Sequence, residues 1–189
     1  MNKRVVFKRG LLLSAMLLAF TGCATTKPPS IVTKTIPVHS KYNTLVSDGP
    51  FEIKLTRAPL GTPIRLVGRP ESVGRTHVSF WGNTVYVSEK WWDIIPPGLV
   101  VVSVPIGDTT SFRAKLSDQS IMQAQRLKFE TFHLRTYDVA HAQVQATQHL
   151  DIDARNESSV FYYGNPAEVA ICRPKGTAEV EHFKQIPKN

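Results

Sequence analysis

Two carboxylates lie two residues apart in the C-terminal half of the chain. Asp151 and Asp153 alternate with apolar residues in the run that starts at His149, so on a β-strand their side chains share one face. Paired carboxylates can act as the acid and the base of glycoside hydrolysis. Alternating acidic residues are more often the solvated face of a strand, and we favour that interpretation. A polysaccharide-acting enzyme is therefore the least favoured of three functional hypotheses for this chain.

Histidines offer a second possible chemistry. His133 and His149 each open a run of alternating residues, His-Leu-Arg-Thr-Tyr and His-Leu-Asp-Ile-Asp. In stacked strands two such imidazoles would be neighbours and could share a metal ion or a proton. No third ligand follows at a zinc-type spacing, and the sequence has no serine–histidine signature, phosphate loop or dinucleotide fingerprint. We predict a half-exposed pair of histidines, no metal or cofactor, and no catalytic residues.

Two aromatic pairs are the candidate ligand-binding residues. Trp91 and Trp92 lie in a proline-rich segment, and Tyr162 and Tyr163 precede a Gly-Asn-Pro turn. Exposed tryptophan and tyrosine can stack on sugar rings or anchor a protein interface. The alternative is that these rings pack against the end of the core.

The first 22 residues are predicted to be a signal peptide. Four basic residues within residues 3–9 precede the apolar stretch 11–20, which is too short to span a bilayer as a helix. The stretch ends in Ala-Phe-Thr-Gly and then Cys23, which resembles the bacterial lipobox. That resemblance implies cleavage after Gly22 and a lipid on Cys23 that anchors the protein to a membrane of the cell envelope. The residue after the cysteine is Ala24 and not the aspartate that is commonly read as an inner-membrane retention signal, which favours the outer membrane. The alternative to a lipoprotein signal is an ordinary secretory signal.

Removal of this peptide changes the charge and the cysteine count. Four of the 23 basic residues and none of the acidic ones lie before Cys23, so the net charge falls from +8 to +4. The remaining chain has no Lys/Arg run that would track a phosphate backbone, so no nucleic-acid partner is predicted. With Cys23 lipidated, Cys172 is the one remaining cysteine. We predict it to be a buried small hydrophobic residue, because it ends an apolar run.

The mature chain is predicted to be an almost entirely β domain. Residues 23–37 are rich in Thr, Lys and Pro and are predicted to be an extended tether. Residues 38–187 form the domain, in which Asp48-Gly49-Pro50 and Gly82-Asn83 are predicted to be turns of a hairpin or meander. No segment keeps a helical period, and residues 68–74 are predicted to be a loop. The predicted strands are residues 41–46, 51–55, 64–67, 77–80, 85–88 and 99–106.

One short pattern recurs four times in residues 110–183. Each unit has two apolar anchors about ten residues apart, surrounded by alternating residues, and the units follow at 22, 16 and 19 residues. Units that cannot bury an apolar face alone are stabilised by stacking on their neighbours. We therefore predict stacked strand–turn–strand units. The anchor pairs are Phe112 and Met122, Leu134 and Val144, Leu150 and Val160, and Val169 and Val180.

The order of strands and turns resembles the GIN domain, a family described as an auto-transporter adhesin head. The resemblance lies in the opening strand, Gly-Pro-Phe turn and second strand of residues 42–55, in Arg-Leu-Val-Gly at 65–68 and in Thr-Val-Tyr-Val at 84–87. It covers residues 38–183 and implies a surface-exposed β-sandwich or short right-handed β-helix without a cofactor or a known active site. The turns at 138–141 and 155–158 depart from the family's Ser-Gly tips, so we predict bulkier and more polar tips.

The sequence thus predicts a membrane-anchored envelope lipoprotein with one all-β, GIN-like domain. Its predicted function is non-enzymatic, adhesin-like binding of a protein or glycan ligand. The alternative is an envelope structural or assembly protein that binds another protein.

Overall fold

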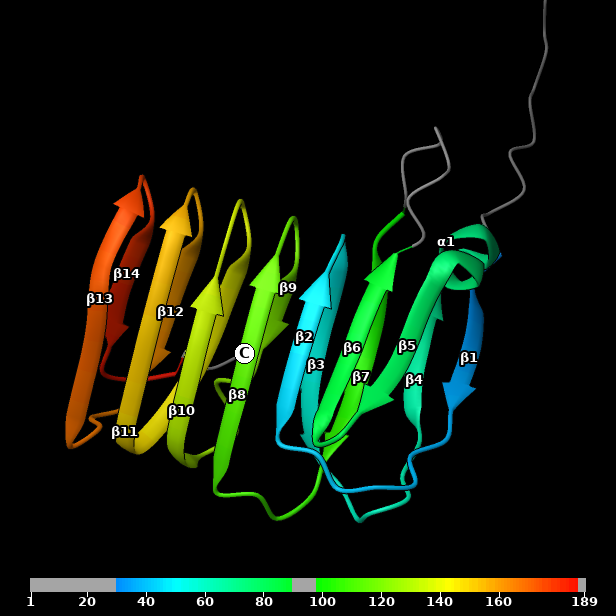
Figure 1. The fold of residues 1–189 in the computed structure, drawn as a ribbon, viewed down its shortest axis with the longest axis horizontal. Coiled ribbons are helices and arrows are strands. Elements are labelled where there is room, and N and C mark those ends of the chain that lie inside the picture. The colour runs from blue at the N-terminus through cyan, green and yellow to red at the C-terminus, as the bar shows by residue number, and fades with distance from the viewer. Residues whose placement is uncertain (1–29, 90–97, 187–189) are drawn as a thin grey trace, which may run out of the picture.

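The computed structural model describes residues 30–89 and 98–186, and these form a two-sheeted β-coil (Figure 1). The all-β prediction is confirmed. The strands are β1 (Val32–Ile36), β2 (Thr44–Asp48), β3 (Phe51–Arg57), β4 (Ile64–Gly68), β5 (Thr76–Trp81), β6 (Thr84–Glu89), β7 (Val100–Ile106), β8 (Ser111–Ser117), β9 (Ile121–Gln123), β10 (Phe129–Thr136), β11 (His141–Asn156), β12 (Ser159–Tyr163), β13 (Glu168–Gly176) and β14 (Glu179–Phe183).

The chain climbs one sheet, crosses to the other and descends, as a right-handed coil (Figure 1). The front sheet holds β6, β2, β8, β10, the second part of β11 and β13, all parallel. The back sheet holds β7, β3, β9, the first part of β11, β12 and β14, also parallel. β11 belongs to both sheets, because residues 141–145 pair with β9 and β12 while residues 149–156 pair with β10 and β13. One front strand and the back strand that follows it make one rung.

Stacking places equivalent apolar residues above one another in successive rungs. Phe132 is the residue of β10 that aligns with Phe112 of β8. It lies two residues before the predicted anchor Leu134, and both side chains point to the same face of the sheet because side chains alternate along a strand. This choice of anchor explains the irregular predicted spacing, since the true steps in the front sheet are 20, 18 and 19 residues. The aligned columns are Phe112, Phe132, Leu150 and Val169 in the front sheet and Met122, Ala142, Val160 and Val180 in the back sheet.

The rungs do not follow chain order. β2 pairs with β6 and β8, and β3 pairs with β7 and β9, so the rung of β2 and β3 lies between two rungs that come later in the sequence. The predicted hairpin or meander at Asp48-Gly49-Pro50 is therefore wrong, because β2 and β3 lie in different sheets. The hairpin at Gly82-Asn83 is confirmed, with Trp81 opposite Thr84 in antiparallel β5 and β6.

Antiparallel strands and a short helix cap one end of the coil. β4 pairs with β7, β5 with β6, and β1 with β4, while helix α1 (Pro70–Arg75) occupies the segment predicted to be a loop. Val32–Ile36 was expected in the tether, but as β1 it pairs with β4 along its length, so folded structure begins before Val38. Within the described residues, no helix is long and apolar enough to span a membrane.

Five passages from the front to the back sheet lie wholly within the described residues, and each contains one residue with a positive φ angle. The polar tips predicted for the turns at 138–141 and 155–158 are confirmed, and hydrogen bonds join them, because Asn156 Nδ2 donates to Asp138 Oδ1 at 2.9 Å. We call this side of the coil the tip edge and the opposite side the base edge. The tip-edge residues with positive φ are Gly49, Asp118, Asp138, Asn156 and Gly176.

Buried hydroxyl groups lie just inside the tip edge. Ser47 and Ser120 hydrogen-bond through their hydroxyls at 2.9 Å, as do Thr136 and Ser158, and all four residues are fully buried. Ser120 also donates to the carbonyl of Gly49 at 3.0 Å. These bonds satisfy polar groups that would otherwise be costly to bury, and they tie neighbouring rungs at the corner.

Gly49→Ala is expected to destabilise the fold by about 1–3 kcal/mol, because φ at Gly49 is +136° and such backbone strain costs about that much. The added Cβ would also lie 2.7 Å from Cε2 of Phe51, a buried ring. Urea unfolding measures the loss.

Gly74→Ala is the matched control for Gly49→Ala. A Cβ at Gly74, in α1, meets no atom within 4 Å, and alanine is the better helix former. An equal loss of stability in both variants would contradict the assignment of strain to the tip edge.

Candidate functional site

A pocket of about 850 Å³ opens at the base edge of the coil. It lies among the loop before β2, the loop after β3 and the loop after β7, with the β5–β6 turn at one side. Its volume is in the range of small-molecule binding pockets, roughly 300–1,000 Å³. We call it the base pocket; its lining residues are Val38, Ser40, Lys41, Tyr42, Asn43, Arg57, Ala58, Pro59, Leu60, Gly61, Thr62, Asn83, Pro105, Gly107, Asp108 and Thr109.

Arg57, the last residue of β3, holds the loops around the base pocket together. Its Nη1 donates to the carbonyls of Gly107 and Thr109, and its Nη2 donates to the carbonyl of Lys128, each at 3.1 Å. The guanidinium also lies 5.7 Å from the ring centroid of Phe129, a distance at which a cation is attracted to an aromatic face. Charge-assisted bonds from a planar donor fix both position and orientation, so Arg57 sets the shape of the pocket wall.

Tyr42 and two asparagines fix a further part of the pocket lining. Tyr42 is buried and its hydroxyl donates to the carbonyl of Pro105. Burial raises the pKa of Tyr42, because desolvation disfavours the phenolate, so the hydroxyl stays a donor. Asn83 Nδ2 donates to Asn43 Oδ1 at 2.8 Å, which joins the β5–β6 turn to the start of β2.

The pocket combines apolar surface with polar groups. Leu60 is 58% exposed, and it lies on the loop between β3 and β4. Lys41, Ser40 and Thr62 supply hydrogen-bonding groups to the same lining. Asp108 is the one carboxylate among the described lining residues, so the paired acid and base of glycoside hydrolysis are not both present there. The mixture of apolar surface and hydrogen-bonding groups suits the pocket to binding a ligand.

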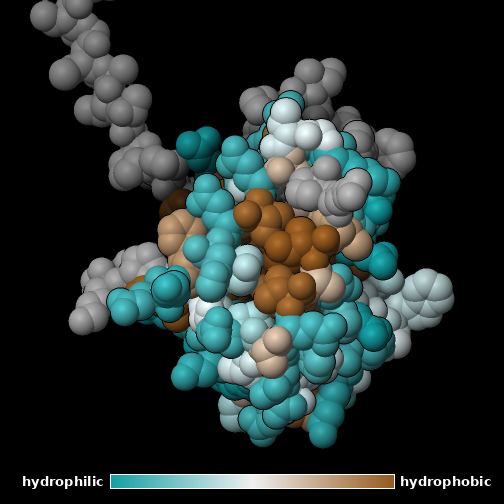
Figure 2. All heavy atoms as spheres, turned by 90° about the vertical axis from the view of Figure 1, so that its left-hand side faces the viewer, coloured by the Kyte–Doolittle hydropathy of each residue, from teal (hydrophilic) through white to brown (hydrophobic). Residues whose placement is uncertain are grey.

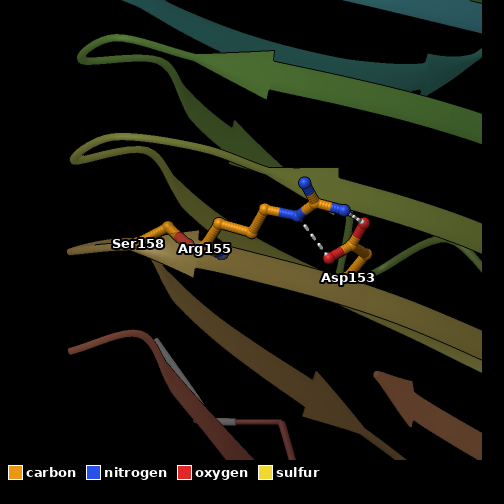
Figure 3. Close-up of polar contacts among 3 residues, drawn as sticks. All are labelled: Asp153, Arg155 and Ser158. Carbon is orange, nitrogen blue, oxygen red and sulfur yellow. Dashed lines mark hydrogen bonds and ion pairs between the residues drawn. The ribbon is translucent and has the colours of Figure 1, made fainter. Parts of the chain in front are cut away.

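The carboxylates that suggested hydrolysis lie elsewhere, on the outer face of β11, and each has a partner. Asp153 forms two bonds to Arg155, at 2.9 Å to Nε and 2.7 Å to Nη2 (Figure 3). The hydrogen bond from Arg155 lowers the pKa of Asp153, aided by the positive charge of that guanidinium. A general acid for glycoside cleavage needs a raised pKa, so Asp153 is unsuited to that role.

The register separates the two histidines that were expected to be neighbours. His133 lies opposite Asp151, whereas His149 lies opposite Thr131. His133 Nδ1 is 3.3 Å from Asp151 Oδ2, and His149 Nδ1 is 2.9 Å from Glu168 Oε2. Each imidazole thus contacts a carboxylate of the next rung. In the described part of the chain no three His, Cys, Asp or Glu residues are grouped so that they could hold a metal ion.

Cys172 is exposed, so the prediction of a buried cysteine is wrong. It lies on β13, in the last rung of the coil. The apolar run that suggested burial, from Val169 to Cys172, has no further rung stacked on it among the described residues. A pattern typical of a buried strand therefore lies at a surface.

The predicted aromatic sites lie in two different parts of the protein. Tyr163 is 4% exposed, and Tyr162 is half-buried and stacks on His182 with ring centroids 4.6 Å apart. The tyrosine pair ends β12 at the base edge. Trp91 and Trp92, like Cys23, lie outside the described residues, and the flanking strands β6 and β7 respectively end and begin at the tip edge. The ligand-binding role of these four residues stays a prediction.

The base pocket was not foreseen from the sequence. Its lining comes from segments that are far apart in the chain, and the coil brings them together only because β3 and β7 are neighbours in the back sheet. One local signal was available, namely Leu60 between Pro59 and Gly61. An apolar side chain flanked by turn residues indicates an exposed hydrophobic group on a loop.

Residues 98–166 match the model of the family described as "Putative auto-transporter adhesin, head GIN domain", which confirms the resemblance over that part of the chain. No curated protein matches the chain.

Solved structures give partial likenesses. A "putative adhesin" from Bacteroides fragilis NCTC 9343 has 13% identity and a TM-score of 0.35, over 82% of this chain and 99% of the other. A "putative adhesin" from Parabacteroides distasonis ATCC 8503 has 10% identity and a TM-score of 0.37, over 82% and 98%. A "Putative lipid binding protein" from the same strain has 10% identity and a TM-score of 0.33, over 83% and 98%.

Asp153→Asn is expected to reduce stability at neutral pH and to flatten its acid dependence. Because the folded-state pKa of Asp153 is lowered, its ionised form stabilises the fold above the unfolded-state pKa of about 4. That contribution is lost as the pH falls through the folded-state pKa. Urea unfolding of both proteins between pH 7 and pH 2 should show the two stabilities converging in acid. A constant difference at every pH would contradict the assignment.

Proposed function

We propose that this protein is a lipid-anchored protein of the cell envelope whose β-coil binds a protein or glycan ligand, in the manner of an adhesin head and without catalysis. The observation that carries the binding role is the base pocket, which combines the exposed Leu60 with hydrogen-bonding groups inside a fixed wall. The family match over residues 98–166 supports an adhesin-like role and a location at the envelope or cell surface.

The pocket geometry favours binding of a protruding part of a larger ligand. Arg57 and Tyr42 use their polar groups to fix the surrounding loops, so the walls are formed before a ligand arrives. A preorganised site avoids the cost of ordering loops on binding. The end of β7 and the loop after it, which supply Pro105 and Thr109, lie within the part that matches the adhesin family. A peptide segment or a few sugar units would fit this arrangement.

The proposed anchor lies close to the folded domain. Cys23 precedes Val32, the first residue of β1, by nine residues, a link that spans at most about 30 Å at roughly 3.3–3.6 Å per residue. Because β1 belongs to the capped end of the coil, that end would be held near the bilayer. Two or more acyl chains on Cys23 would make the attachment stable.

Leu60→Glu is expected to reduce ligand binding at least tenfold without changing the melting temperature. The side chain is largely exposed, so a charge there alters the pocket and not the core. The measurement is binding of the purified domain to an immobilised panel of envelope and host glycans and of surface proteins, with the melting temperature as a folding control.

Leu99→Glu is the matched control, because Leu99 is 51% exposed and precedes β7 at the tip edge. Binding that survives Leu60→Glu but is lost in Leu99→Glu, or on replacing Trp91 and Trp92 with alanine, would reject the base pocket as the binding site.

Cys23→Ser is expected to release the protein from the membrane fraction, because the variant lacks the thiol that carries the lipid. Fractionation of cells followed by immunoblotting measures the change. A serine variant that stays with the membrane would reject lipid anchoring at this residue. It would not affect the proposed binding role, which the Leu60→Glu variant tests separately.

A further inference from the structure

The end of the coil opposite the cap carries an apolar surface that the described residues leave uncovered. Figure 2 views the molecule from this end and shows a brown patch ringed by hydrophilic groups. Val169 and Ile171 of β13 and Phe183 of β14 are 37%, 41% and 40% exposed. Leu150 and Ile152, which occupy the positions of Val169 and Ile171 one rung earlier, are 1% and 0% exposed.

The same end has two unpaired strand edges. β13 pairs with β11 on one side only, and β14 pairs with β12 on one side only, within the part of the chain that the structure describes. A free edge presents a row of backbone donors and acceptors that can pair with another strand. A well-matched partner therefore supplies two strand edges with an apolar strip between them.

The charges at this end favour an antiparallel arrangement. β13 begins at the exposed Glu168 and carries the exposed Lys175 near its end. β14 begins at the exposed Glu179 and is followed by the exposed Lys184. A parallel partner strand with the same sequence would align like charges, whereas an antiparallel one places the acidic start of each strand beside the basic end of its partner. Opposite charges across paired strands are stabilising.

We propose that this open end binds the open end of a second copy of the chain, related by a two-fold axis. β13 then pairs with β13 of the other copy and β14 with β14, so that strands of equal length meet and both sheets continue. The two apolar patches cover each other, and a closed isologous contact of this kind ends at two copies. This inference goes beyond the proposed function and does not depend on it.

Cys172 provides a built-in reporter of this contact. It is the middle residue of β13 and is exposed. Antiparallel pairing of β13 about its middle would place the two Cys172 residues opposite each other, where Cα atoms lie about 4.5–5.5 Å apart. A short bis-maleimide should then link two copies.

The test uses two differently tagged full-length chains expressed together and extracted in detergent. Co-purification of both tags, and a cross-linked species of twice the mass that is lost in Cys172→Ser, are expected. Ile171→Lys should reduce co-purification at least tenfold. Val139→Lys is the matched control, because Val139 is 38% exposed at the tip edge, and it should associate normally.

A charge exchange tests the orientation without altering the apolar patch. Glu168→Lys alone should weaken co-purification, and Glu168→Lys combined with Lys175→Glu should restore it, because antiparallel strands recreate the opposite-charge contacts. Chains that purify singly, association unaffected by Ile171→Lys, loss of association in Val139→Lys, or no restoration by the charge exchange would each overturn the proposal.

Discussion

The coil depends on one backbone constraint, a residue with a positive φ angle at every passage from the front to the back sheet that the structure describes. The passages are stacked on one another, so the position of each one fixes where the back strand after it begins. This in turn fixes the register of the parallel strands. Side chains alternate strictly along a strand, so a slip of one residue would turn every inward group outward. The chain meets the requirement with glycine at Gly49 and Gly176 and with polar residues between them. Asn156 uses its side chain to bind Asp138, so the corner also links rungs.

The sequence predicted the repeating units because their information is local. Alternation identifies strands, and polar residues with a tolerance for positive φ identify the corners. Choosing Leu134 instead of Phe132 as an anchor was an error of two residues, which alternation alone cannot detect. The place of β2 and β3 between later rungs is a long-range feature. No local pattern encodes it, because a parallel neighbour can come from any part of the chain.

The candidate site was predictable to a smaller extent for the same reason. The outward face of Asp151 and Asp153 follows from alternation, but the partner of Asp151 lies on the preceding rung and depends on register. The partner of Asp153 is Arg155, two residues further along the same strand, so this contact is local and the sequence contains it. The base pocket depends on loops whose positions follow from the topology. Leu60, an apolar residue between two turn residues, is the part of the base pocket that the sequence alone indicates.

The two ends of the coil differ, and this difference constrains how the protein sits in the envelope. Antiparallel β4 and β5, with α1, end the parallel stacking on one side, whereas β13 and β14 leave it open on the other. Since Cys23 shortly precedes β1 at the capped end, a proposed lipid anchor and the open end lie at opposite ends of the stack. A pair joined at the open ends then carries its anchors at its two far ends. Both anchors reach one bilayer only if the long axis of the pair lies along the membrane; an upright pair would connect two membranes.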